Sequence, residues 1–138
     1  MKIVIIDGQG GKMGKSVIEQ LKKRFPGLET YAIGTNSIAT SAMLKAGATY
    51  GATGENPVIV NAQDADIIIG PIGIVMANSL LGEITPAMAT AIGISKAYKI
   101  LIPVNRCNHY IVGCQNSTLS DYINMVCDEV VQTAFPCY

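Results

Sequence analysis

The sequence has no excess of charge of either sign, and its cysteines and histidine lack the spacing of a metal site. Lys and Arg together number 10 among the 138 residues, as do Asp and Glu. Without a basic field the chain has nothing to hold a phosphodiester backbone, so we expect no nucleic-acid partner. The four cysteines form no CxxC pair, and no second histidine or acidic cluster accompanies His109. We therefore expect no bound metal.

The sequence shows neither a secretory leader nor a membrane-spanning run. No apolar segment at the N-terminus is followed by a cleavage site, and the longest uncharged stretch, 67–82, is too short for a span and is interrupted by glycine, proline and asparagine. These features predict a cytoplasmic protein with reduced thiols and no membrane partner.

The most informative stretch is the beginning of the chain. An apolar run over 2–6 leads into the glycine-rich segment 7–14 and then into an amphipathic helical pattern. A buried parallel strand reads as such a continuous β-branched run. Glycines directly after it let amide N–H groups approach an anion, and the following helix directs the positive end of its dipole at that anion. The segment therefore predicts a phosphate-binding loop.

Apolar runs and amphipathic segments alternate along the rest of the chain. Further strands are expected at 29–34, 58–60, 66–70 and 99–104, with a candidate last strand at 110–112. Helices are expected from the glycine loop to Pro26, from 35–37 to Gly47, from 85 to about 96 and from 118 to 134, and a loop at 51–57. The second of these helices is expected to bury Ile38, Ala42, Met43 and Ala46.

The expected strands are apolar throughout rather than alternating, so both faces of their sheet should be covered. The chain has no internal repeat and no linker. The pattern predicts an α/β fold in one domain over 1–138. Its sheet should be doubly wound (Rossmann-like) and mostly parallel, with five or six strands and helices on both faces.

The glycine loop departs from the strict GxGxxG spacing, because Met13 stands where the third glycine would fall. It fits GxxGxxG instead, with Gly14 allowing the helix to pack closely on the sheet. The string GQGGKMGK resembles the cofactor loop of dihydrodipicolinate reductase, which binds the pyrophosphate of NAD or NADP. The resemblance implies this role for Gly8, Gln9, Gly10, Gly11, Lys12 and Met13. The alternative is a turn that serves folding alone.

The end of the second expected strand lacks the acidic residue of an NAD site. A dinucleotide fold usually carries Asp or Glu there, and its carboxylate accepts hydrogen bonds from the adenosine ribose. Here Thr35, Asn36 and Ser37 follow, whose neutral groups could contact a ribose or a 2′-phosphate, although no arginine stands nearby. NADP is therefore favoured over NAD. The alternative role of these three residues is to cap the following helix.

Over most of its length the chain resembles a family of small Rossmann-like proteins catalogued as a domain of unknown function. The matching segments are IDGQGG, GTNSIATSAMLKAGA, YGATGENPVIVN, GPIGIVMANSLLGEITPAMA and ILIPVNRCN. This resemblance implies a fold without naming a substrate. The chain also lacks the separate substrate domain of dihydrodipicolinate reductase, so the resemblance of the loop does not imply reductase activity.

Two further segments are expected at the carboxyl edge of the sheet, where doubly wound folds bind ligands. The first segment consists of Gly70, Pro71, Ile72 and Gly73, and its backbone could approach a flat ring. The second segment is 105–108, in which Asn105 and Arg106 could hold a carboxylate or phosphate. The alternatives are an ordinary turn and an exposed charge. Glu55, Cys107 and His109 are weaker candidates for proton transfer or nucleophilic chemistry.

Three functions remain open at this point. The first is a protein that binds NADP, NAD or another small-molecule nucleotide as a sensor or as a subunit. The second is a small NAD(P)-dependent oxidoreductase with its site at the interface of a homo-oligomer, because one small domain encloses little space. The third is an assembly protein without a ligand, in which the apolar stretch 72–81 forms an interface.

Overall fold

The computed structural model describes residues 1–104, 109–114 and 117–136, and the first strand lies at its centre. All five residues of β1 (Ile3–Asp7) are buried. This strand pairs in parallel with β2 (Thr30–Gly34) on one side and with β4 (Ile67–Pro71) on the other. The apolar runs at 2–6, 29–34 and 66–70 are thus strands, as predicted.

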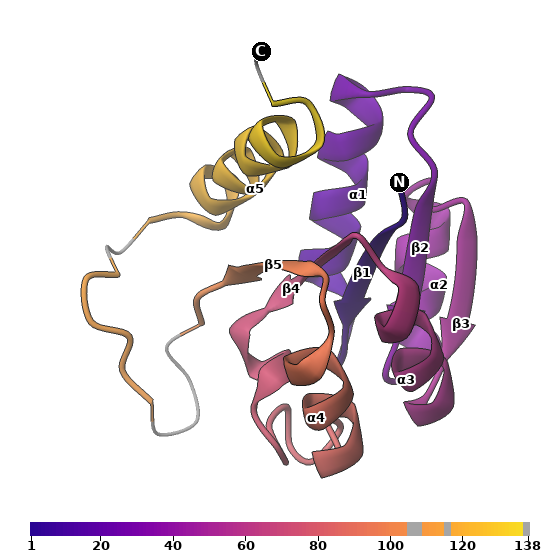
Figure 1. Cartoon of the computed structure of the whole chain (residues 1–138), viewed down its shortest axis with the longest axis vertical. Helices are drawn as coiled ribbons and strands as arrows, with labels where there is room; N and C mark the ends of the chain where they lie inside the picture. Colours follow the sequence, from indigo (N-terminus) through magenta and orange to yellow (C-terminus); the bar gives the residue numbers. More distant parts are fainter. Residues whose placement is uncertain (105–108, 115–116, 137–138) are drawn as a thin grey trace.

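The sheet is completed by an edge strand on each side. The order is β3-β2-β1-β4-β5 and every pair is parallel, with β3 (Tyr50–Thr53) and β5 (Tyr98–Ile102) at the edges (Figure 1). In this order the winding of the chain reverses beside β1, as in dinucleotide-binding folds. The predicted doubly wound α/β sheet is confirmed, with five strands among the described residues.

Helices cover both faces of the sheet (Figure 1). One layer consists of α1 (Lys12–Arg24), α2 (Ser37–Lys45) and α5 (Leu119–Ala134), which pack on the face that carries Ile3 and Ile5. The other consists of α3 (Glu55–Asp64), the short 3-10 helix η1 (Ile72–Val75) and α4 (Pro86–Ile94), which pack on the face that carries Val4 and Ile6. No helix among the described residues is long and apolar enough to cross a membrane.

The last helix is tied to the first rather than to the sheet alone. Arg24 at the end of α1 donates to Asp128 of α5 over 2.6 Å. Val126, Cys127 and Val130 of α5 lie in the same core as the buried face of α1. Residues 109–114, which come between β5 and α5 in the sequence, lie to one side of the body of the protein (Figure 1).

The predictions for 51–60 and 110–112 are wrong. The expected strand at 58–60 lies inside α3, whose buried face is formed by Val58 and Ala62. Pro57 does not prevent this helix, because amides of the first turn have no intrahelical partner. Residues 50–53 form β3, which lacks an apolar run because it is an exposed edge. Residues 110–112 form no strand.

The buried face of α2 departs from the prediction at Ile38, whereas Met43 is buried as predicted and Ala42 and Ala46 are half-buried. Ile38 is 69% exposed, whereas Ala39, Thr40 and Met43 are buried. Asn36 is the N-cap of α2, and its side chain accepts from the amide of Ala39. This cap fixes where the helix begins and turns Ile38 toward solvent.

Two isoleucines offer a matched test of this core. Ile5→Ala should lower the free energy of unfolding by about 2–5 kcal/mol, because Ile5 is fully buried and its loss leaves a cavity in the central strand. Ile38→Ala should change it by less than about 0.5 kcal/mol, because this side chain is exposed. Urea denaturation measures both values, and equal losses would contradict the assignment of the core.

Candidate functional site

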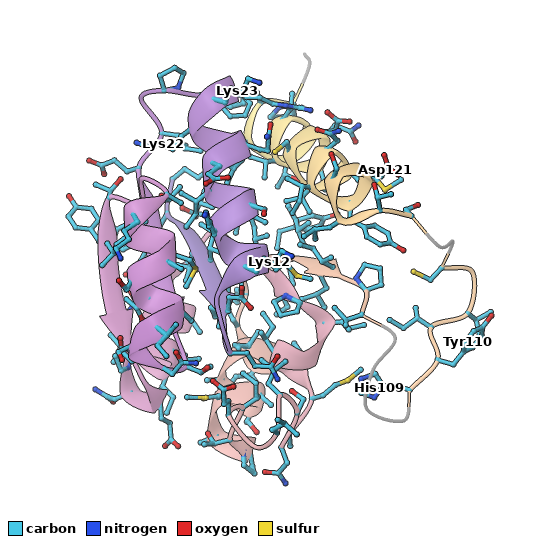
Figure 2. All side chains as sticks on the ribbon, turned by 180° about the vertical axis from the view of Figure 1, so that it is seen from behind. Lys12, Lys22, Lys23, His109, Tyr110 and Asp121 are labelled. Carbon is cyan, nitrogen blue, oxygen red and sulfur yellow. The ribbon has the colours of Figure 1, made fainter. Side chains whose placement is uncertain are left out.

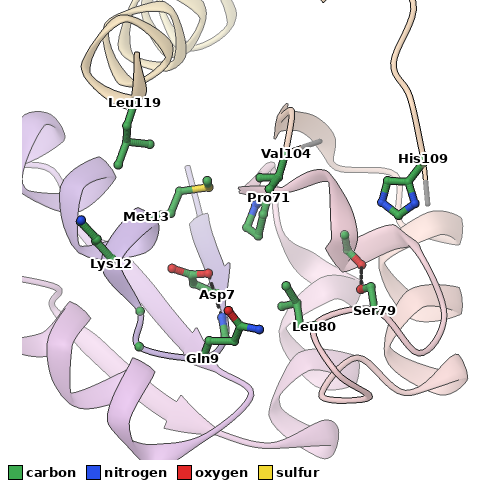
Figure 3. Close-up of a pocket in the computed structure, with 14 residues that line it drawn as sticks. Asp7, Gln9, Lys12, Met13, Pro71, Ser79, Leu80, Val104, His109 and Leu119 are labelled. Atoms are coloured by element: carbon green, nitrogen blue, oxygen red, sulfur yellow. Dashed lines mark hydrogen bonds between the residues drawn. The ribbon is translucent and has the colours of Figure 1, made fainter. Parts of the chain in front are cut away.

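A cleft of about 350 Å3 opens at the carboxyl edge of the sheet, between the loop after β1 and the segment after β4 (Figure 3). Residues 7–13 form one wall, and Pro71, Gly73, Ser79 and Leu80 form another. Val104, His109 and Leu119 contribute the rest of the lining. This position is the switch point of the sheet, where doubly wound folds bind ligands.

The glycine loop is a tight turn that packs against α2. The amide of Gly11 donates to the carbonyl oxygen of Gly8 over 2.9 Å, and Gly11 has a φ of 71°. A Cβ atom on Gly11 would lie 2.7 Å from the Cα of Ala39, and one on Gly14 would lie 2.5 Å from the Sδ of Met43. The predicted role of Gly14 in close packing of the first helix is confirmed, and Gly11 is likewise required by the fold.

Gly10 differs from its neighbours. No atom would lie within 4 Å of a Cβ on Gly10, and its φ is not positive. Neither packing nor backbone conformation therefore requires glycine here. The absent side chain leaves open space above the backbone, which a ligand can approach closely.

Asp7 binds the ends of the loop together from below. Its two carboxylate oxygens accept from the amides of Gly8 over 2.8 Å and Gly14 over 2.7 Å. The cap position of α1, Gly11, offers no side-chain acceptor, and the first turn of α1 has no acidic residue. Asp7, at the end of the preceding strand, supplies both the hydrogen-bond acceptor and the acidic group. A helix beginning without Ser, Thr, Asp or Asn is the signal that could have identified this residue from the sequence.

The buried position of Asp7 affects its proton affinity. Burial raises the pKa of Asp7 above 3.8, and the negative charge of Glu83 acts in the same direction. The hydrogen bonds from Gly14, Gly8 and Met13 oppose this rise without cancelling it.

Two amides of the loop remain available to a ligand. The amides of Gly8 and Gly11 donate within the loop, and that of Gln9 donates to Glu83. Among the described residues, no acceptor pairs with the amides of Gly10 and Lys12. The loop therefore retains donors for one anionic group. The prediction that residues 8–13 bind a cofactor is consistent with this arrangement but remains a prediction.

Among the described residues that line the cleft, Lys12 is the one lysine or arginine. Figure 2 shows Lys12 at the end of α1 nearest the cleft and Lys22 and Lys23 at the opposite end. Lys22 and Lys23 lie at the negative end of the helix dipole and therefore stabilise α1. Lys12 lies where the dipole is positive, so a bound anion would relieve an unfavourable interaction there.

A carboxylate that the sequence did not predict lies beside the end of β2. Glu83 precedes α4, and its side chain accepts from Thr35 Oγ1 over 2.8 Å, from Asn36 Nδ2 over 2.5 Å and from the amide of Gln9 over 3.1 Å. Burial acts to raise the pKa of Glu83, but these hydrogen bonds outweigh it and lower the pKa below 4.5. Because Glu83 is 74 residues from Gln9 in the sequence, no local sequence pattern predicts this contact.

The chain around Glu83 is conformationally strained. Asn78, Leu80 and Leu81 have φ values of 64°, 53° and 56°, in the left-handed region that leucine rarely adopts. Such residues cost about 1–3 kcal/mol each and persist where the surrounding structure imposes them. Here Ser79 donates to the carbonyl oxygen of Gly73, and Ile84 is fully buried. The strain is therefore held by anchors on both sides of Leu80 and Leu81.

The remaining predicted residues are distributed around this cleft. Pro71 and Gly73 line it, whereas Gly70 and Ile72 do not. Gly70 lies within β4, where a Cβ atom would be 2.4 Å from the carbonyl oxygen of Ile6. Thr35 and Asn36 contact Glu83, and Ser37 is exposed on another face. Their assignment as cofactor contacts remains a prediction.

The weaker candidates are separated from one another. His109 lines the cleft, and Glu55 is the exposed first residue of α3, away from its lining. Asn105, Arg106 and Cys107 lie outside the described residues. Within the described part of the chain, no three His, Cys, Asp or Glu side chains converge as a metal site.

Comparisons with known proteins agree with this architecture. A family model described as Domain of unknown function (DUF3842) matches residues 2–134. A solved structure, titled as a dodecameric FMN-dependent Ubix-like decarboxylase from Escherichia coli O157:H7, is 14% identical with a TM-score of 0.54. The alignment covers 97% of this chain and 94% of that one, and at this identity it shows a shared fold. Comparison with curated proteins gives no match.

Gly11 and Gly10 should respond differently to the same substitution. Gly11→Ala should lower the free energy of unfolding by about 2 kcal/mol or more, because the methyl group meets the backbone of Ala39 and φ is positive. Gly10→Ala should change it by less than about 0.5 kcal/mol. Chemical denaturation decides this, and a large loss for Gly10→Ala would show that the fold requires this glycine.

The hydrogen bonds of Glu83 predict a pH dependence of stability. Because the pKa of Glu83 is lowered from 4.5 in the folded state, its contribution is present above that value and is lost as the pH falls through the folded pKa. On acidification below about pH 5, wild type should therefore lose stability more steeply than Glu83→Gln. Denaturation at a series of pH values measures the two slopes. Parallel curves would show that the carboxylate is not stabilised by these contacts.

Proposed function

The chain belongs to the family described as Domain of unknown function (DUF3842), and we propose that it binds a nucleotide-derived cofactor through a single phosphate group. The observation that carries this proposal is a pair of amides, those of Gly10 and Lys12, that no acceptor in the described part of the chain engages, at the mouth of a cleft at the switch point of the sheet. Backbone amides at a helix N-terminus are a common binding site for phosphate.

The phosphate is proposed to lie above Gly10. The open space over this residue admits an anion to the backbone, and Lys12 supplies the positive charge. Asp7 and Glu83 are both acidic, but their oxygens are directed at protein donors rather than left free to face the ligand. The donors that remain match one phosphate better than the two of a pyrophosphate.

The rest of the cleft suits a flat, largely apolar ring. Met13, Pro71, Leu80, Val104 and Leu119 line it, from both sides of the sheet edge (Figure 3). Outside the loop itself, the polar side chains that the described residues contribute to the lining are those of Ser79 and His109. A mostly apolar cleft with a few placed polar groups is typical of small-molecule and cofactor sites, and its volume is at the small end of their range.

Flavin mononucleotide and the nicotinamide dinucleotides are the cofactors to compare. Flavin mononucleotide combines one terminal phosphate with a flat ring, and the solved structure that shares this fold is titled as FMN-dependent. NADP and NAD are the cofactors that the glycine loop first suggested. We propose a nucleotide with one terminal phosphate, and we take flavin mononucleotide as its probe.

A ligand titration tests this proposal. Flavin mononucleotide should raise the melting temperature in proportion to the logarithm of its concentration, because it binds only the folded state. Gly10→Ala should weaken this binding about tenfold or more, equivalent to about 1.4 kcal/mol, because its methyl group occupies the space of the phosphate. Gly27→Ala is the matched control, since Gly27 also has open space around it but lies at the far end of α1.

Three outcomes would overturn the proposal. One is the absence of a shift with flavin mononucleotide, NADH and NADPH at millimolar concentration. Another is equal affinity of wild type and Gly10→Ala for every ligand that binds. The third is a loss in Gly27→Ala as large as that in Gly10→Ala, which would show that the effect does not arise at the loop.

A further inference from the structure

We propose that Glu83 determines the class of nucleotide that the cleft takes, because its carboxylate fills the half of the site beside β2 and so excludes dinucleotides. The inference rests on the proposed function and adds the residue that selects among nucleotides. It concerns a different part of the site from the phosphate position above Gly10.

The carboxylate of Glu83 lies where the sheet order places the ribose of a dinucleotide. In dinucleotide-binding folds of this order, the residue after β2 contacts the adenosine ribose. Here the first two residues after β2, Thr35 and Asn36, both donate to Glu83 Oε1, over 2.8 and 2.5 Å. The amide of Gln9 donates to both carboxylate oxygens over 3.1 Å. One side chain thus bridges the glycine loop and the end of β2.

These contacts use the donors that a ribose or a 2′-phosphate would need. An incoming dinucleotide would have to displace Glu83 from its three hydrogen-bond donors before gaining any hydrogen bond of its own. A 2′-phosphate would also approach a carboxylate that is ionised at neutral pH, and like charges repel. The acid that an NAD site places at the end of β2 is present here, but it comes from another segment and is already paired with protein donors.

The segment that carries Glu83 holds it in place. The amide of Ile84 donates to the carbonyl oxygen of Ser79, and the amide of Asn78 donates to the carbonyl oxygen of Ile84. Residues 78–84 therefore form a closed loop. Ile84 is fully buried next to Glu83. Leu80 packs on the glycine loop, since a Cβ atom on Gly8 would lie 2.9 Å from its Cδ1. Of the two left-handed leucines in this loop, Leu80 lines the cleft and Leu81 is 92% exposed.

Residues 1–104, 109–114 and 117–136 leave the half of the cleft toward β4 open. Pro71, Gly73 and Val104 line it, and Thr35 and Asn36 do not. A mononucleotide with its phosphate above Gly10 would place its ring in this half and would not meet Glu83. The structure therefore favours a mononucleotide such as flavin mononucleotide over NADP and NAD.

Removal of the Glu83 side chain should widen the ligand range. Flavin mononucleotide, NADH and NADPH are titrated separately into wild type, Glu83→Ala and Glu83→Gln by calorimetry. Wild type is expected to bind flavin mononucleotide and neither dinucleotide at millimolar concentration. Glu83→Ala should bind both dinucleotides, with its affinity for flavin mononucleotide within about threefold of wild type, a change of about 0.7 kcal/mol or less.

The glutamine variant separates space from charge. Glu83→Gln keeps the size of the side chain and one oxygen acceptor, so it should still exclude dinucleotides, whereas dinucleotide binding equal to that of Glu83→Ala would overturn exclusion by occupancy. If Glu83→Ala unfolds, Glu83→Gln serves in its place, because glutamine keeps the size of the side chain. Binding of flavin mononucleotide and of neither dinucleotide by Glu83→Gln then supports the proposal. Glu55→Ala, which removes an exposed carboxylate away from the cleft, is the charge control and should behave as wild type.

Failure of this inference differs from failure of the proposed function. If wild type binds NADPH as tightly as flavin mononucleotide, or if folded Glu83→Ala binds flavin mononucleotide and still no dinucleotide, selection by Glu83 is wrong while phosphate binding stands. If no variant binds any of the three ligands, both proposals are wrong. If Glu83→Ala alone gains dinucleotide binding, and Gly10→Ala abolishes it in the double variant, both are supported.

Discussion

The carboxylate of Asp7 is the contact on which the site depends, because it joins the end of the central strand to the beginning of the first helix. Its hydrogen bonds to the amides of Gly8 and Gly14 fix the distance between β1 and α1, and the intervening loop has to close within that span. Gly11 can then turn back on Gly8 and pack on Ala39. The amides of Gly10 and Lys12 are left outside this network, and they are the groups that the loop presents to the cleft.

A buried acid beneath the proposed anion site imposes an electrostatic constraint. The charge of Asp7 offsets part of the positive potential at the start of α1, so the loop is a weaker anion site than an uncapped helix would be. Glu83 adds a second negative group nearby and helps to raise the pKa of Asp7. Both carboxylates are satisfied by protein donors, so the site depends on local geometry at Gly10 and Lys12 more than on a broad positive field.

The fold could be predicted largely from the sequence because its central strands are buried on both faces. Burial on both sides produces the apolar runs at β1, β2 and β4, and these runs are visible without knowledge of tertiary structure. The same rule failed at β3, since an exposed edge strand has no such run, and at Val58, where helix and strand periods are indistinguishable over three residues.

The site was predictable only where it is local. The loop after β1 and the turn after β4 were identified because each follows directly from a buried strand. Asp7 was within that loop, but its role depends on an orientation toward Gly14 that the sequence does not state. Glu83 reaches the site from the loop before α4, and its place is set by tertiary packing around Ile84 and by left-handed residues that no propensity favours. The sequence places no acid directly after β2, and the carboxylate that lies there comes from a distant segment.

The salt bridge between Arg24 and Asp128 affects which parts of the cleft can change among related sequences. Because α5 is fastened to α1, Leu119 keeps its place on the cleft whatever the length of the segment that precedes it. Val104 and His109, which also line the cleft, come before α5 in the sequence. Insertions and deletions between β5 and α5 would change the wall that includes Val104 and His109, while the wall formed by the glycine loop stays fixed. Relatives with the same glycine loop could therefore differ in the shape of the opposite wall.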